Sequence, residues 1–180
     1  MKRSRILAVL ISFALCGAAN AQRYRDNGAL RALEEVLYDL EDLVDESRDS
    51  KLADKAEDVL SKLEDAANEL SKRPADSSAA AGNLEGAIGD LEAAVKDRLL
   101  DPDSGIGLMD DLAGVSRSLA VRALTAAGRR SGRGDIRQAR SDLSRGDSLR
   151  ASGRRGSIGA FKRAAARYKD ALSKAESALD

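Results

Sequence analysis

Apolar residues recur at intervals of three and four along most of the chain, and this spacing is typical of amphipathic helices. The first run places five aliphatic residues on one face: Leu30, Leu33, Leu37, Leu40 and Val44. Similar runs follow, and together they predict helices over 28–47, 50–72, 77–99, 106–127, 135–152 and 157–179. We therefore expect an all-α protein, an antiparallel up-down bundle of five or six helices with no sheet.

Turn and capping residues separate these runs. Asp49 and Ser50 both suit a helix N-terminus, so we expect the chain to turn there instead of continuing as one long helix. The Pro- and Gly-containing stretch 101–105 predicts a loop. Asp135 suits the N-cap of the fifth helix, and the glycines of 153–156 predict a break before the sixth.

Glycines interrupt the third predicted helix at Gly82, Gly86 and Gly89. Each costs about 1 kcal/mol relative to Ala inside a helix. They line one side, so they would let a neighbouring backbone approach closely. We expect an Ala/Leu-rich core with small-residue contacts near Gly82 and Gly86.

Residues 34–42 reappear in similar form at 57–65, 23 residues further along the chain. Two interpretations stay open. Similar helices converge on similar residues, or the chain contains a duplicated helical unit, which would suit an array or an up-down bundle.

The first 21 residues have the pattern of a cleaved signal peptide. A positively charged start precedes an apolar run at 6–14, which is too short to span a bilayer. Small residues at 19 and 21 form a cleavage site, so the mature chain should begin at Gln22. The alternatives are a retained membrane anchor and a lipid on Cys16, which the bulky residue before it disfavours. We expect a periplasmic or secreted protein, a single helical domain over 22–180, with no transmembrane segment after cleavage.

Charge divides this domain into two parts. Residues 22–111 carry 24 acidic and 11 basic side chains, a net charge of −13. Residues 112–180 carry 6 acidic and 16 basic side chains, a net charge of +10, and 13 of the cations are arginine. The acidic and basic parts therefore attract each other, or the basic part attracts an anionic partner.

The mature chain lacks both histidine and cysteine, because the sequence has no His and its one Cys lies in the signal peptide. This excludes His-dependent triads, Cys nucleophiles and His/Cys zinc sites. The many carboxylates alternate with lysines along helix faces, as solvated surfaces do. We expect no enzyme, no catalytic residue, no metal site and no cofactor.

The candidate binding residues are arginines near the start of the fifth predicted helix: Arg129, Arg130, Arg133, Arg137 and Arg140. The last four recur at spacings of three and four, and so share a face. Arginine forks bind phosphate and carboxylate. Two interpretations compete: the acidic and basic parts neutralise each other across helix interfaces, which we favour, or this cluster binds an anionic polymer. Polysaccharide and lipopolysaccharide fit better than nucleic acid, because aromatic stacking residues are scarce.

Two short motifs invite a functional interpretation. Asp101 and Asp103 could bind Ca²⁺, but they lack the distal ligands of a calcium loop, so a turn with a helix cap is favoured. Arg133-Gly134-Asp135 spells an integrin-type tripeptide, and its aspartate is better explained as an N-cap.

Two family resemblances follow from particular residues. Residues 52–128 resemble the FIMAH domain of bacterial secreted and surface proteins, on the run 59–63 with Ala66, then Leu84, 87–88 and Val95. This resemblance implies a structural or binding module with no catalytic residues. The last helix pair resembles a degenerate tetratricopeptide unit, on these residues: Gly146, Asp147, Leu149, Gly153, Ala164, Tyr168 and Ala171. Its inner gap is too long for the standard repeat, so we expect an ordinary helical hairpin.

The sequence thus predicts a non-enzymatic structural or interaction module of the bacterial envelope or exterior. The alternative is an anion-binding protein that uses the arginine cluster. The partner would be an unknown protein or an anionic polymer. A homo-oligomer also stays open, because an Ala-rich helix face can pair with a second copy.

Overall fold

The computed structural model describes residues 28–46, 50–72, 75–129 and 133–179, with the backbone alone at 45, 46 and 133–135. The predicted signal peptide lies outside them. These residues form α3 (Gly28–Glu46), α4 (Ser50–Ser71), α5 (Ser77–Lys96), α6 (Pro102–Ala127), α7 (Arg133–Arg154) and α8 (Ala160–Ser177). Within the described ranges no strand occurs. The all-α prediction is confirmed.

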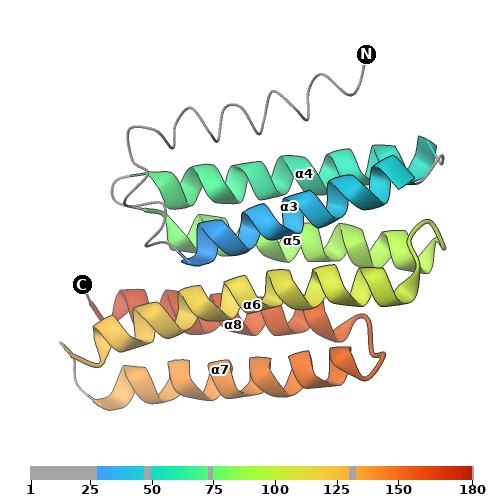
Figure 1. The fold of residues 1–180 in the computed structure, drawn as a ribbon. Coiled ribbons are helices and arrows are strands. Elements are labelled where there is room, and N and C mark those ends of the chain that lie inside the picture. Colours follow the sequence, from blue (N-terminus) through green and yellow to red (C-terminus); the bar gives the residue numbers. More distant parts are fainter. Residues whose placement is uncertain (1–27, 47–49, 73–74, 130–132, 180) are drawn as a thin grey trace.

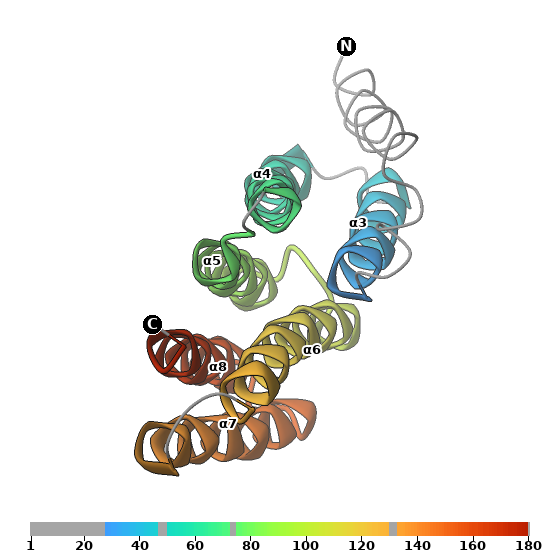
Figure 2. The same ribbon diagram turned by 90° about the vertical axis from the view of Figure 1, so that its left-hand side faces the viewer.

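Consecutive helices run in opposite directions, as Figure 1 shows. Helices α3 and α4 are separate antiparallel neighbours, as predicted, and Asp49 lies outside the described residues. Helices α3, α4, α5 and α6 pack in a ring in which each touches the next. Helix α8 packs on α5 and α6, and α7 covers α6 and α8 from outside. Figure 2 shows α3 and α4 at one edge of the bundle and α7 at the other.

The core is built from the aliphatic stripes that the sequence predicts. In α3, Leu33, Val36, Leu37 and Leu40 are all buried. One apolar cluster joins the buried stripes of α3, α4, α5, α6 and α8, and it includes the two buried aromatic side chains of α8. Burying a Leu or Val side chain stabilises the fold by about 1.5–3 kcal/mol. Packing of these stripes therefore holds the helices together.

Helix α6 corrects the predicted loop at 101–105. The Asp101 side chain accepts hydrogen bonds from the backbone N–H groups of Asp103 and Ser104, both at 3.0 Å, and Pro102 is the first helical residue. An aspartate followed by proline is typical of a helix start. The aspartate accepts hydrogen bonds from unpaired backbone N–H groups, and proline has no N–H group that needs a partner. The stretch is therefore the first turn of α6, which confirms the cap and not the loop.

Two helices end in a Schellman motif, with a left-handed residue after the last turn. After α5 this residue is Arg98 (φ 58°), and after α7 it is Gly156 (φ 94°). The backbone N–H groups of Leu99 and Ser157 close the motifs on carbonyls five residues back. The predicted break at 153–156 thus starts too early, because Gly153 lies inside α7. Helix α7 also begins at Arg133, which places Asp135 in its first turn and not at its N-cap.

The predicted close approach of a neighbouring backbone to Gly82 and Gly86 is wrong. A Cβ built on Gly82 meets nothing within 4 Å, and one on Gly86 meets the Lys62 side chain at 3.0 Å. The glycines of α7, in contrast, pack closely against α8. A Cβ on Gly146 would lie 2.5 Å from the Tyr168 ring, and one on Gly153 would lie 2.7 Å from the Phe161 ring. Glycine in α7 therefore makes room for aromatic rings, not for a neighbouring backbone.

Candidate functional site

The predicted arginine cluster lies where α6 passes into α7. Arg129 follows α6 directly, and Arg137 and Arg140 lie in the first half of α7. All three side chains are exposed, and no ion pair among the described residues holds them. Arg130 lies outside the described residues, as does the side chain of Arg133. The structure thus brings Arg129, Arg137 and Arg140 to one end of the bundle.

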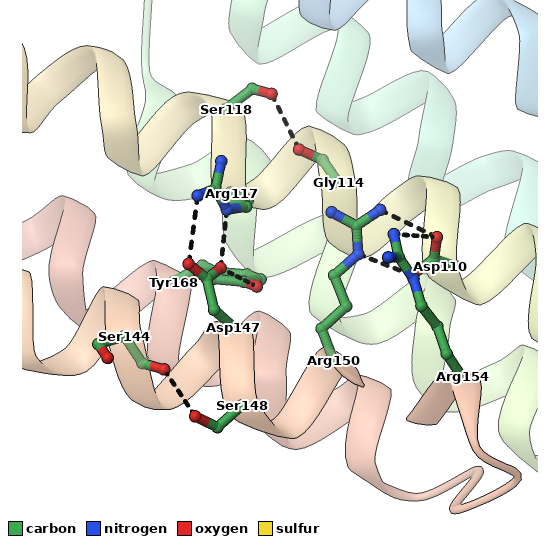
Figure 3. Close-up of polar contacts among 10 residues, drawn as sticks. All are labelled: Asp110, Gly114, Arg117, Ser118, Ser144, Asp147, Ser148, Arg150, Arg154 and Tyr168. Atoms are coloured by element: carbon green, nitrogen blue, oxygen red, sulfur yellow. Dashed lines mark hydrogen bonds and ion pairs between the residues drawn. The ribbon is translucent and has the colours of Figure 1, made fainter. Parts of the chain in front are cut away.

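Other arginines of the basic part are bound between helices, as Figure 3 shows. Asp110 of α6 accepts two hydrogen bonds from Arg150 of α7, at 2.7 and 3.0 Å. It accepts two more from Arg154, both at 2.8 Å. Burial alone would raise the pKa of Asp110, but these two guanidinium groups outweigh it and hold the pKa below its ordinary value.

Asp147 of α7 repeats this arrangement in the opposite sense. It accepts two hydrogen bonds from Arg117 of α6, at 2.7 and 3.2 Å. The hydroxyl of Tyr168 donates a third, at 2.8 Å. Burial again opposes ionisation, but the bonds from Arg117 and Tyr168 lower the pKa of Asp147. The Tyr168 pKa is raised, first by burial and then by the carboxylate beside it.

Asp142 is the most deeply buried carboxylate in the described part of the chain, with a side chain only 1% exposed. Lys174 of α8 donates to it, and Arg167 of α8 lies at 3.5 Å. Arg145 of α7 approaches to 3.9 Å. Burial opposes its charge, but Lys174 and the two arginines keep the pKa of Asp142 lowered. Asp142 therefore joins α7 to α8.

These contacts bear on the two interpretations of the charge division. Asp110 and Glu85 of the acidic part bind cations of the basic part, Glu85 through Lys169 of α8. Asp142 and Asp147, however, belong to the basic part itself. Part of the basic charge is thus neutralised by ion pairs between helices, as the favoured interpretation expects. Arg129, Arg137 and Arg140 form no such ion pair among the described residues.

Sequence reasoning missed these interhelical pairs, although a signal was present. Helix α6 contains Asp110 and Arg117, and α7 contains Asp147 and Arg154, seven residues apart in each case. A spacing of seven returns to the same helix face. Because the two helices are antiparallel, each aspartate meets arginine from the other helix. Two equal Asp-to-Arg spacings therefore mark a pair of neighbouring antiparallel helices.

A second integrin-type tripeptide, Arg145-Gly146-Asp147, is also helical. Gly146 is buried under the Tyr168 ring, and Asp147 is bound to Arg117. The first tripeptide, at 133–135, forms the opening turn of α7. Both tripeptides therefore have a helical backbone and not an extended one.

A groove of about 380 Å³ lies between α3 and α6. Small residues line it, with Glu35 and Asp39 of α3, Asp111 of α6, and the bound Arg117 and Arg150. The pKa of Asp111 is raised by burial and then by the negative charge of Asp110. Arg150 opposes this rise, and Asp39 and Glu35 add smaller contributions to it. Glu35 and Asp39 thus place negative charge on the α3 side of the groove, and Arg31 of the same helix pairs with Glu35.

The described helices also bear on metal binding and on the membrane. In this part of the chain, no three acidic, His or Cys side chains are grouped to hold a metal ion. Asp101, the Ca²⁺ candidate, caps α6. None of the described helices has the length and apolar character needed to cross a membrane.

Comparison with known proteins found no match for this chain. No protein-family model matches it, and neither a curated protein nor a solved structure does. The resemblances to the FIMAH domain and to a tetratricopeptide unit therefore stay predictions.

Proposed function

We propose that this protein is a non-enzymatic interaction module, exported to the bacterial envelope or exterior. The observation that carries the proposal is the division of its arginines. Arg117, Arg150 and Arg154 face another helix and are held by aspartates. Arg129 and Arg137 face solvent without such a partner among the described residues. Exposed arginine that no ion pair of the fold consumes is available to an acidic partner.

Partner capture tests this proposal. Every described helix begins at or after Gly28, so a chain that starts at Gln22 keeps all six. It would be cross-linked in an envelope fraction, beside a variant with Arg129, Arg137 and Arg140 changed to Gln. A matched control changes Arg155, Lys162 and Arg163 to Gln at the opposite end of α7 and α8. We expect a partner that the control captures and the cluster variant loses. Equal capture by both variants would contradict the proposal.

Export has its own test. Expressed with its first 21 residues in a bacterial host, the protein should be recovered outside the cytoplasm with Gln22 as its first residue. Mass spectrometry of the intact protein gives the cleavage site. Retention of Met1, or a lipid on Cys16, would contradict the proposed export route.

A second candidate function, binding of an anionic polymer, is favoured by the exposure of Arg137 and Arg140 on one helix beside Arg129. Fluorescence anisotropy with a labelled anionic polysaccharide would measure it, with salt varied from low to above physiological. Affinity should fall steeply with salt, because exposed charges are screened beyond about 8–10 Å at physiological ionic strength. The cluster variant should lose it. Absence of binding at low salt would exclude this candidate.

A further inference from the structure

The outer face of α3 carries an exposed aromatic side chain among carboxylates. Tyr38 is 54% exposed, and no other large hydrophobic side chain in the described residues is exposed in this way. Glu35, Asp39 and Asp42 flank it, and all three are exposed. Their spacings from Glu35 of three, four and seven place the four residues on one face. The buried Leu33 and Leu40 lie on the other side of the helix.

A tyrosine bordered by carboxylates matches a cationic protein surface. Tyrosine and arginine are the residues most enriched at the energetic centres of protein interfaces, with tryptophan. A guanidinium group over a tyrosine ring gains cation–π attraction as well as ion pairing. Among the described residues, the one ion pair of this face joins Arg31 to Glu35, an exposed contact at 3.5 Å within one helix. Such surface pairs contribute little, so a partner can replace it.

The same chain carries a complementary surface at its other edge. On α7, Arg137 and Arg140 are exposed, and Arg145 is exposed with a single long contact to Asp142. Ser144 and Ser148 lie between and beside them, exposed and uncharged. Figure 2 shows α3 and α7 on opposite edges, so the two faces cannot meet within one molecule. Helices α3 and α7 are of similar length, 19 and 22 residues.

We propose that copies of this protein associate head to tail, with the α3 face of one copy (Glu35, Tyr38, Asp39 and Asp42) on the α7 face of the next (Arg137, Arg140 and Arg145). This inference rests on the proposed function, because it names the partner of the arginine surface. The two faces differ, so the contact is heterologous. Each bound copy leaves one face of each kind open, and association then continues into a chain or ring.

Sedimentation velocity on chains starting at Gln22 tests this inference with one variant for each face. The α3-face variant is Tyr38→Ser with Asp39→Asn and Asp42→Asn. The α7-face variant is Arg137→Gln with Arg140→Gln. Both change exposed side chains only, and far-ultraviolet circular dichroism should show unchanged helix content. The unchanged chain should form oligomers that grow with concentration at low salt and dissociate at high salt.

Mixing the two variants separates head-to-tail association from every symmetric arrangement. Each variant alone should be monomeric, because it lacks one of the two faces. Their equimolar mixture should form a dimer and nothing larger, because only one complementary contact remains. Oligomers of either variant alone, larger species in the mixture, or a monomeric unchanged chain at low salt would overturn the inference.

Matched controls identify the groups responsible. Asp58→Asn with Asp65→Asn removes two exposed carboxylates from α4, and Arg155→Gln with Lys162→Gln removes two cations far from the α7 face. Both controls should associate like the unchanged chain. Tyr38→Phe keeps the ring and should also associate, whereas Tyr38→Ser alone should weaken association tenfold or more. Equal loss in the controls would mean that net charge, not these faces, drives association.

The polysaccharide experiment keeps this inference distinct from the proposed function. A chain that stays monomeric but binds polysaccharide through Arg137 and Arg140 would overturn head-to-tail association and leave the proposed function standing. A chain that associates but captures no external partner would support the association and overturn the wider proposal. If both occur, added polysaccharide should dissociate the oligomers, because both ligands occupy the α7 face.

Discussion

Helices α5 and α7 both carry several glycines, yet they use them in opposite ways. In α5, Gly86 and Gly89 face the flexible side chains of Lys62 and Lys162. In α7, Gly146 and Gly153 face buried aromatic rings of α8. A lysine stem can move aside for a methyl group, whereas a ring packed on all sides cannot. The cost of a glycine substitution therefore depends on the rigidity of its neighbour, not on the glycine.

The largest expected effect on stability comes from removing an aromatic ring that packs against a glycine of α7. Phe161→Ala should lower the free energy of unfolding by about 3–5 kcal/mol, because it leaves a cavity beside Gly153. Lys162→Ala, next to it on α8 and over Gly89, should change it by less than about 0.5 kcal/mol. Urea denaturation measures both. A loss under about 1 kcal/mol for Phe161→Ala would remove the contrast between the two helices.

Adding a methyl group to the same glycine sharpens the comparison. In Gly153→Ala the new Cβ would lie 2.7 Å from the Phe161 ring, so the ring must move. Overpacking of this kind costs about 1–3 kcal/mol, and the better helix propensity of alanine offsets part of it. Thermal and urea unfolding should both show a less stable protein. A more stable Gly153→Ala variant would mean that the α7–α8 seam is loosely packed.

The ion pairs between α7 and its neighbours predict a loss of stability in acid. The pKa values of Asp110, Asp142 and Asp147 are lowered in the fold from 3.8. Each group therefore stabilises the fold above pH 3.8 and loses this contribution as the pH falls through its lower folded value. Asp142→Asn should cost about 1–2 kcal/mol at neutral pH. Its unfolding free energy should also fall less between pH 5 and pH 2, measured with urea at each pH. An unchanged acid dependence would contradict this.

The smallest expected effect is a gain on the α5 side. A Cβ on Gly82 meets nothing within 4 Å, and the residue lies inside a helix. Gly82→Ala should therefore raise the free energy of unfolding by up to about 1 kcal/mol. An increase in the melting temperature would confirm it. A destabilised variant would instead indicate a close contact at Gly82 and restore the original prediction for α5.

Most of the fold could be predicted because a helix is encoded by residues that are close together in the sequence. The aliphatic stripe of α3 and the predicted turn before α4 required only residues near each other in sequence. The wrong boundary at Asp101 also concerns neighbouring residues. An aspartate, a proline and a glycine close together predict a loop, but here the aspartate and the proline begin a helix. The error at Gly82 was different. Residue spacing shows that a helix face carries small side chains, but it does not show which neighbour packs against that face.

The candidate site was predicted less completely, for a related reason. The spacing of Arg137 and Arg140 places them on neighbouring positions of one helix surface. Nothing near them in sequence distinguishes them from Arg150 and Arg154, which have the same residue type and a spacing of four. The difference lies in Asp110, 40 residues away from Arg150 in sequence and 2.7 Å from it in space. Which arginines stay available is therefore a property of the packed helices.

The sequence by itself determined the helices, their turns and the division of charge, because hydrophobic period, caps and composition act over a few residues. Tertiary structure alone decided which glycines pack against an aromatic ring, which arginines are bound by aspartates and which helix faces lie at the outer edges of the bundle. These properties depend on the neighbours of each helix, and those neighbours are set by the packing of several stripes at once.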